Sequence, residues 1–103
     1  MPVYEIDWSE EAKQDVRELS PFVRGPVFAA VDLLTHQAEI ETRNRKRLEG
    51  RFDEFPEASW ELRILGDHRV IYRIVERRTV RILRVILKGR RTTAEALKRS
   101  PKR

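Results

Sequence analysis

The chain has 103 residues, which suits one domain of ordinary size, residues 1–103, and no more. It contains no Cys and only two His, so disulfides and thiolate metal sites are excluded, and we expect no metal or other cofactor. Its 22 Lys and Arg outnumber 17 Asp and Glu, which gives a net charge of +5 and favours a polyanion or an acidic protein as partner.

The N-terminus has no charged leader followed by a long apolar run. No stretch reaches the roughly 18 apolar residues of a membrane span. We therefore expect a cytoplasmic protein with no signal peptide and no membrane partner.

A short strand and two helices are predicted in the first third of the chain. Residues 3–8 alternate between two sets of side chains, as a strand does. Ser9 is a good N-cap, and acidic residues follow it where the helix dipole favours them, so we expect a helix over 10–19. A second apolar stripe follows, and its helix begins either at Pro21 or, after an interruption, at Pro26.

Strands dominate the second half of the prediction. Residues 38–58 are polar and predict an irregular loop. Alternating or β-branched patterns, separated by turn residues, then predict three strands, at residues 60–65, 68–75 and 80–87. A short last helix is expected to run from Thr92 or Thr93 to Leu97.

Together these elements predict an α+β fold. It consists of a small antiparallel sheet with the two N-terminal helices packed on one face, in the order β-α-α-β-β-β, with a short C-terminal helix. The helices need an apolar surface to cover, and one face of the sheet supplies it. We expect the opposite face to stay free for function.

Arginines are predicted to converge on that free face. Alternation places Arg63 opposite the apolar residues of its own strand, and on the next strand Arg69 shares a face with Ile71 and Arg73. We therefore expect Arg63, Arg69 and Arg91, with Lys46 and Arg90 nearby, to line one concavity and bind phosphate through bidentate contacts. The plainer interpretation is a set of ordinary surface ion pairs with neighbouring acids, namely Glu61, Asp67 and Glu76.

Five short motifs follow one another on this predicted topology. They are Trp8-Ser9 followed by Ala12, Lys46-x-Leu48-x-Gly50, Trp60-x-Leu62-Arg63, Gly66 with Arg69-x-x-Tyr72, and Ile82-Leu83-Arg84-Val85 ending in Gly89-Arg90-Arg91. With this ordered series the chain resembles the RelE/ParE superfamily of bacterial toxins from type II toxin–antitoxin pairs, over about residues 4–97. No single motif is specific, whereas the series at these spacings is fairly specific.

The resemblance implies the fold described above and one of two activities. RelE-like members cut messenger RNA on the ribosome without a metal ion. ParE-like members poison DNA gyrase and cut nothing themselves. Members of both kinds are neutralised by a co-expressed, usually acidic antitoxin, which we therefore expect as the partner of this chain.

The resemblance also implies particular site residues. RelE-like nucleases use strand lysines, an Arg at the start of the next strand, an Arg after the last strand and a C-terminal Tyr. Arg69 matches the first Arg, and Arg91 or Arg90 matches the second. The positions that carry the lysines and the Tyr hold other residues here, namely Ser59, Glu61 and, for the Tyr, about Leu97.

We therefore expect two groups of functional residues. The catalytic group is Arg69, Arg91, Arg63 and His68, and the RNA-binding group is Lys46, Arg47, Lys88 and Arg90. We expect His68 to act as a proton acid or base, as histidine side chains commonly do, although a solvated turn histidine is the plainer interpretation. Tyr72 lies within an apolar strand, which favours core packing over a role as stacking group or proton donor.

Three functions stay open on this basis. The preferred hypothesis is a metal-independent, ribosome-dependent messenger RNA endoribonuclease that inhibits translation, because the arginines can stabilise a crowded phosphate. The alternative is a ParE-like gyrase poison without nuclease activity. A third hypothesis is an inactive family member that acts chiefly as the partner of its antitoxin in DNA-bound repression.

Overall fold

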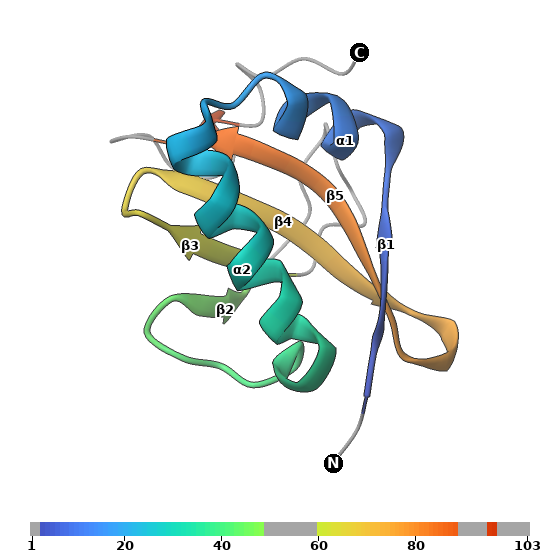
Figure 1. Ribbon diagram of the computed structural model, residues 1–103. Coiled ribbons are helices and arrows are strands. Elements are labelled where there is room, and N and C mark those ends of the chain that lie inside the picture. The colour runs from blue at the N-terminus through green and yellow to red at the C-terminus, as the bar shows by residue number, and fades with distance from the viewer. Residues whose placement is uncertain (1–2, 49–59, 89–94, 97–103) are drawn as a thin grey trace.

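The structure is a computed structural model, and it describes residues 3–48, 60–88 and 95–96. The described residues form a five-stranded sheet in the order β1-β5-β4-β3-β2, with two helices across one of its faces (Figure 1). In chain order the elements are β1 (Glu5–Trp8), α1 (Glu10–Arg17), α2 (Pro21–Gln37), β2 (Arg45–Arg47), β3 (Trp60–Ile64), β4 (His68–Val75), the 3-10 turn η1 (Glu76–Arg78) and β5 (Thr79–Leu87).

The sheet is mixed because one strand pairs in parallel. β2, β3, β4 and β5 pair antiparallel in sequence, whereas β1 pairs in parallel with β5. Parallel strands need a crossover connection, and the chain from α1 to β4 supplies it. The predicted α+β arrangement is confirmed, and β1 is the strand that departs from antiparallel pairing.

Strand β2 lies where we expected only an irregular loop. Its three residues are all basic and show no apolar alternation, so periodicity gave no signal for it. The strand is anchored through Arg45, whose buried guanidinium donates from Nη1 to the carbonyl of Ile40 at 3.1 Å. Its Nη2 also donates to Gln37 Oε1 at 3.3 Å, so β2 is tied to the C-terminal end of α2.

Both helices begin where their sequence signals place them. Ser9 Oγ accepts a hydrogen bond from the N–H of Ala12 at 3.0 Å, as expected of an N-cap. α2 begins at Pro21 and continues through Pro26, so the earlier of the two predicted starts is confirmed. Pro26 cannot donate to the carbonyl of Phe22, but Phe22 is 81% exposed, so water can satisfy that carbonyl.

The main core lies between the helices and the sheet. Its members include Val16, Val27, Val31 and Leu34 from the helices, and Leu62, Val70, Tyr72, Val80 and Ile82 from the strands. Tyr72 is fully buried, stacks on Trp60 with ring centroids 6.1 Å apart and donates from its hydroxyl to the carbonyl of Ala38 at 2.7 Å. Core packing of Tyr72 is thus confirmed, and burial raises the pKa of its phenol.

The sheet face opposite the helices is only partly open. A smaller apolar cluster lies there, made of Ile71, Leu83, Ile86 and Ala96, with Leu48 packed against it. We expected this face to stay free, and for that part of it the expectation is wrong. The reason is that Ile71 and Ile86 alternate with residues of the main core and so need an apolar cover of their own.

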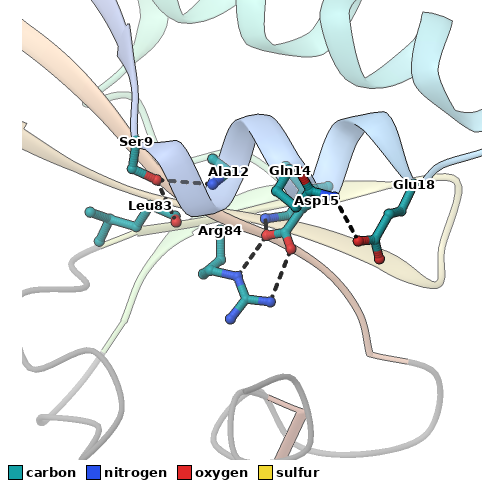
Figure 2. Close-up of polar contacts among 8 residues, drawn as sticks. Ser9, Ala12, Gln14, Asp15, Glu18, Leu83 and Arg84 are labelled. Atoms are coloured by element: carbon teal, nitrogen blue, oxygen red, sulfur yellow. Dashed lines mark hydrogen bonds and ion pairs between the residues drawn. The ribbon is translucent and has the colours of Figure 1, made fainter. Parts of the chain in front are cut away.

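Helix α1 closes the edge of β5 beyond the point where β1 ends (Figure 2). Ser9 Oγ donates to the carbonyl of Leu83 at 2.9 Å, and Asp15 Oδ2 accepts from the N–H of Val85 at 2.9 Å. Backbone groups on a sheet edge need partners when they are buried, and here helix side chains supply them.

The same carboxylate of Asp15 also holds Arg84. Arg84 donates from Nε to Oδ2 at 2.6 Å and from Nη2 to Oδ1 at 3.0 Å (Figure 2). Both side chains are buried, with 2% and 4% of their surface exposed. This bidentate pair gives Arg84 a structural role inside the fold.

Arg24 joins the two helices in a similar way. Its Nε donates to the carbonyl of Val16, and its Nη2 donates to the carbonyls of Arg17 and Leu19. The last carbonyls of a helix have no partner within it, so a cation from α2 both satisfies the end of α1 and complements its dipole.

Candidate functional site

Four predicted basic residues meet on the sheet face opposite the helices. Lys46 of β2 pairs with Glu61 of β3, and Arg63 of β3 pairs with Arg69 of β4. Residues directly opposite each other on paired strands share a face, so these side chains project from the same side of the sheet. Lys88 follows β5 on that side, and we call Lys46, Arg63, Arg69 and Lys88 the basic cluster.

A single buried carboxylate lies within the basic cluster. Glu61 is 4% exposed, and its Oε2 lies 3.8 Å from Lys46 Nζ and 3.7 Å from Arg69 Nε. Its strand neighbour across the sheet is Ile71, a member of the smaller apolar cluster, which explains why the carboxylate is shielded from solvent. Four cations and one carboxylate leave this surface strongly positive.

Arg69 is turned inward, toward the hairpin between β3 and β4. Its Nη1 donates to the carbonyl of Gly66 at 2.7 Å and to that of His68 at 3.0 Å, and the residue is 4% exposed. Leu65 and Gly66 form the turn with positive φ angles of 51° and 81°, a conformation that glycine adopts readily. Burial lowers the pKa of the Arg69 guanidinium, Glu61 raises it, and Arg63 lowers it further.

The other three cations remain accessible to a ligand. The Lys46 side chain is 66% exposed, Arg63 is exposed and Lys88 is half-buried. The N–H of Lys88 donates to the carbonyl of Asp67 at 2.7 Å, which fixes this residue beside the hairpin turn. Burial lowers the pKa of Lys88, Glu61 opposes that change, and the remaining members of the basic cluster lower the pKa further.

The position of Lys46 depends on how β2 is held. Arg45 anchors this strand to α2, as described above, and the N–H of Arg63 donates to the carbonyl of Asn44 at 2.7 Å. Because Arg45 points into the fold, Lys46 must point to the opposite face. A buried arginine therefore directs its neighbour toward Glu61.

Two predicted site residues lie on the other face. His68 pairs with Ile64, and Arg47 pairs with Trp60, so both project from the side that the helices cover. We expected His68 to lie with Arg63 and Arg69. The structure instead places it on the opposite face of the sheet.

The remaining predicted site residues, Arg90 and Arg91, lie outside the described residues. Within the described ranges, no group of three or more His, Asp and Glu side chains is arranged to hold a metal ion.

The cluster is suited to binding phosphate by electrostatics. Lysine and arginine side chains form charge-assisted hydrogen bonds with phosphate oxygens, and three of the cluster's cations reach solvent. Sequence reasoning identified Glu61 only as a surface partner for arginine and missed its buried place among the cations. The available signal was its alternation with Trp60 and Leu62, which puts it on the face of Arg63.

Comparison with known proteins shows the family to which the chain belongs. A sequence model of the family described as "ParE toxin of type II toxin-antitoxin system, parDE" matches residues 6–92. The chain belongs to this family. It is thus a RelE/ParE superfamily toxin of a type II toxin–antitoxin system, and the family resemblance is confirmed. No curated protein matches it.

Solved structures of RelE toxins share the fold of this toxin. The toxin–antitoxin complex RelBE2 from Mycobacterium tuberculosis has a chain with 28% identity and a TM-score of 0.61, covering 81% of this chain and 95% of that one. The archaeal RelE–RelB complex from Pyrococcus horikoshii gives 21% identity and a TM-score of 0.67, covering 85% and 98%. The isolated E. coli RelE toxin gives 22% identity and a TM-score of 0.62, covering 93% and 97%.

None of the helices in the described part of the toxin is both long enough and apolar enough to cross a membrane.

Proposed function

We propose that this toxin inhibits translation as a metal-independent endoribonuclease that acts on messenger RNA in the ribosome. The observation that carries the proposal is the basic cluster, which gathers cations from β2, β3, β4 and the end of β5 on one side of the sheet. An RNA backbone presents closely spaced phosphates, and a surface of this kind binds them with little regard to sequence.

The proposal gives the cations different tasks. Arg63 and Lys46 are exposed and contact phosphates directly. Arg69 is buried and bonded to two carbonyls, so it acts as a fixed positive charge beneath the scissile phosphate. Arg91 remains the proposed second arginine of the scissile phosphate, with Arg90 beside it as an RNA contact.

Proton transfer is not assigned to His68 in this proposal. Its register places it on the helix-covered face, away from the phosphate that the basic cluster would hold. The proton of the attacking 2′-hydroxyl then passes to a non-bridging oxygen of the scissile phosphate. As the new bond to phosphorus forms and the bond to the 5′-oxygen breaks, a proton from that phosphate oxygen passes to the leaving 5′-oxygen, so that no protein base is required.

Cell-free translation tests the proposal. The double variant Lys46→Gln, Arg63→Gln should raise the toxin concentration needed for half-inhibition by about tenfold or more, because two charge-assisted contacts are lost. Primer extension on the ribosome-bound message should show loss of the same cleavage products. The control is Arg17→Gln, an exposed cation on α1 in the helix layer, which should inhibit like the wild type. A wild-type toxin that leaves messages intact in this assay would end the nuclease proposal.

The second candidate function is poisoning of DNA gyrase. One observation favours it, namely that the matching family model is that of ParE toxins. The resemblance adds that Glu61 stands at a position where a RelE-like nuclease is expected to carry a lysine. A supercoiling assay separates the candidates. Inhibition with accumulated double-strand breaks supports gyrase poisoning, whereas an unaffected topoisomerase reaction rejects it.

We also propose an acidic antitoxin as the partner that neutralises this toxin. The solved relatives from M. tuberculosis and P. horikoshii are toxin–antitoxin complexes, and the basic cluster offers charge complementarity to an acidic chain. Such a chain would cover the exposed cations and fold as it binds.

A further inference from the structure

Glu61 is a buried carboxylate on the face of the sheet that carries the basic cluster. It lies under the surface that the proposed function assigns to RNA, and its Oε2 lies within 4 Å of two cations of the basic cluster. A buried carboxylate is stable only where charges or hydrogen bonds compensate its lost hydration, and Lys46 and Arg69 supply such charges. The same carboxylate holds those cations close together against their mutual repulsion.

The negative charge of Glu61 must also weaken the attraction of this surface for an anion. A phosphate bound by Lys46 and Arg63 would lie within about 8 Å of Glu61, since the three residues occupy neighbouring positions on β2 and β3. A unit charge at that distance, at an effective dielectric constant of about 20 and screened by about 0.1 M salt, changes affinity by about fivefold.

We infer that Glu61 is an internal counter-anion that sets the affinity of the basic cluster for polyanions. Its negative charge offsets the repulsion among the cations of the basic cluster. The same charge limits the affinity of the cluster for RNA. The inference rests on the proposed RNA-binding surface and goes beyond it by naming the residue that tunes that surface.

Fluorescence anisotropy with a labelled ten-nucleotide oligouridylate tests the inference. Glu61→Gln keeps the side-chain shape and removes the charge, and it should bind the oligonucleotide about fivefold more tightly than the wild type at about 0.1 M salt. The matched control is Glu76→Gln, which changes the net charge equally but lies at the other end of β4 and is exposed. It should bind within about twofold of the wild type. Equal affinities of the two variants would overturn the inference.

A second variant covers the case in which Glu61→Gln does not fold. Glu61→Met removes the same charge and places an apolar side chain of similar length beside Ile71, its neighbour across the sheet. It should also bind the oligonucleotide about fivefold more tightly than the wild type, because the lost charge is the same. Binding no tighter than that of Glu76→Gln would overturn the inference.

The outcome can be told apart from failure of the proposed function. If Glu61→Gln binds the oligonucleotide more tightly while the wild type neither cleaves messages nor inhibits translation, the inference stands and the nuclease proposal fails. If the wild type cleaves messages and inhibits translation but Glu61→Gln binds no more tightly than Glu76→Gln, the nuclease proposal stands and the inference about Glu61 fails.

Discussion

At the scale of single residues, Asp15 joins helix α1 to strand β5 through three hydrogen bonds. Its carboxylate accepts hydrogen bonds from Arg84 Nε, from Arg84 Nη2 and from the N–H of Val85, all in a buried setting. Removing one partner of a buried pair leaves an uncompensated charge, which costs far more than the loss of a surface pair.

Asp15→Asn should therefore lower the free energy of unfolding by about 3 kcal/mol. Urea denaturation followed by circular dichroism measures this. The control is Asp7→Asn, which breaks the half-exposed pair with Arg81 and should cost less than about 1 kcal/mol. Equal losses in the two variants would show that burial does not decide the contribution of Asp15.

The buried phenol of Tyr72 should make the free energy of unfolding depend on pH in the alkaline range. Burial raises the pKa of its phenol above the unfolded value near 10, so the folded state keeps the proton more firmly than the unfolded state. The stabilisation is fully present below pH 10 and is lost as the pH rises toward the folded pKa, with a slope of up to about 1.4 kcal/mol per pH unit. Tyr72→Phe should flatten this decline, as measured by urea midpoints at pH 8 to 11, because it cannot ionise. A parallel decline in both proteins would contradict the assignment.

At the scale of elements, three arginines act as connectors between segments. Arg24 ties α2 to the end of α1, Arg45 ties β2 to the end of α2, and Arg84 ties β5 to α1. Helix ends and sheet edges leave backbone groups unpaired, and the forked guanidinium can reach several of them at once. Arg45 has a consequence for function, since its neighbour Lys46 belongs to the basic cluster.

Arg45→Met should loosen β2 without unfolding the sheet. The carbonyl of Ile40 and the side-chain oxygen of Gln37 lose the guanidinium that binds them, so β2 is held less firmly. The backbone amides that link β2 to β3 should therefore exchange with deuterium about tenfold faster. The amide of Arg63, which donates to Asn44, is the reporter, and amides between β4 and β5 should not change. Arg47→Met, an exposed change in the same strand, serves as the control; faster exchange there as well would count against the anchoring role of Arg45.

At the scale of the whole molecule, the total of 22 Lys and Arg overstates how many cations face a partner. Arg24, Arg45, Arg69 and Arg84 all make bonds inside the fold. The cations that an RNA can reach in the basic cluster are Lys46, Arg63 and Lys88. Affinity for a polyanion should follow this smaller set.

The salt dependence of oligouridylate binding measures the size of that set. The three exposed cations of the basic cluster should together contribute about −2 to the slope of log K against log salt, since single strands contribute about −0.7 for each phosphate contact. The proposed contacts of Arg90 and Arg91 would make the slope steeper. The double variant Lys46→Gln, Arg63→Gln should make the slope shallower by about 1.4, because two contacts are lost. A wild-type slope near zero would exclude the basic cluster as the RNA-binding surface.

Much of the fold could be predicted from the sequence because local chemistry determines it. Ser9 and Pro21 begin helices through capping and a preset backbone angle, and β-branched alternation marks β3, β4 and β5. The β2 strand could not be predicted in this way. Its residues Arg45–Arg47 carry no apolar period, and only contacts with α2 and β3 order them.

By itself, the sequence determined the α+β architecture, the family and the face on which Arg63 and Arg69 lie, because these depend on periodicity and on motif order along the chain. Only the tertiary structure decided which cations serve the surface and which serve the fold. That choice depends on which buried carbonyls and carboxylates lie within reach of each guanidinium, and those groups come from distant segments. Glu61 shows the difference: its face follows from alternation, whereas its burial among cations follows from the packing of three strands.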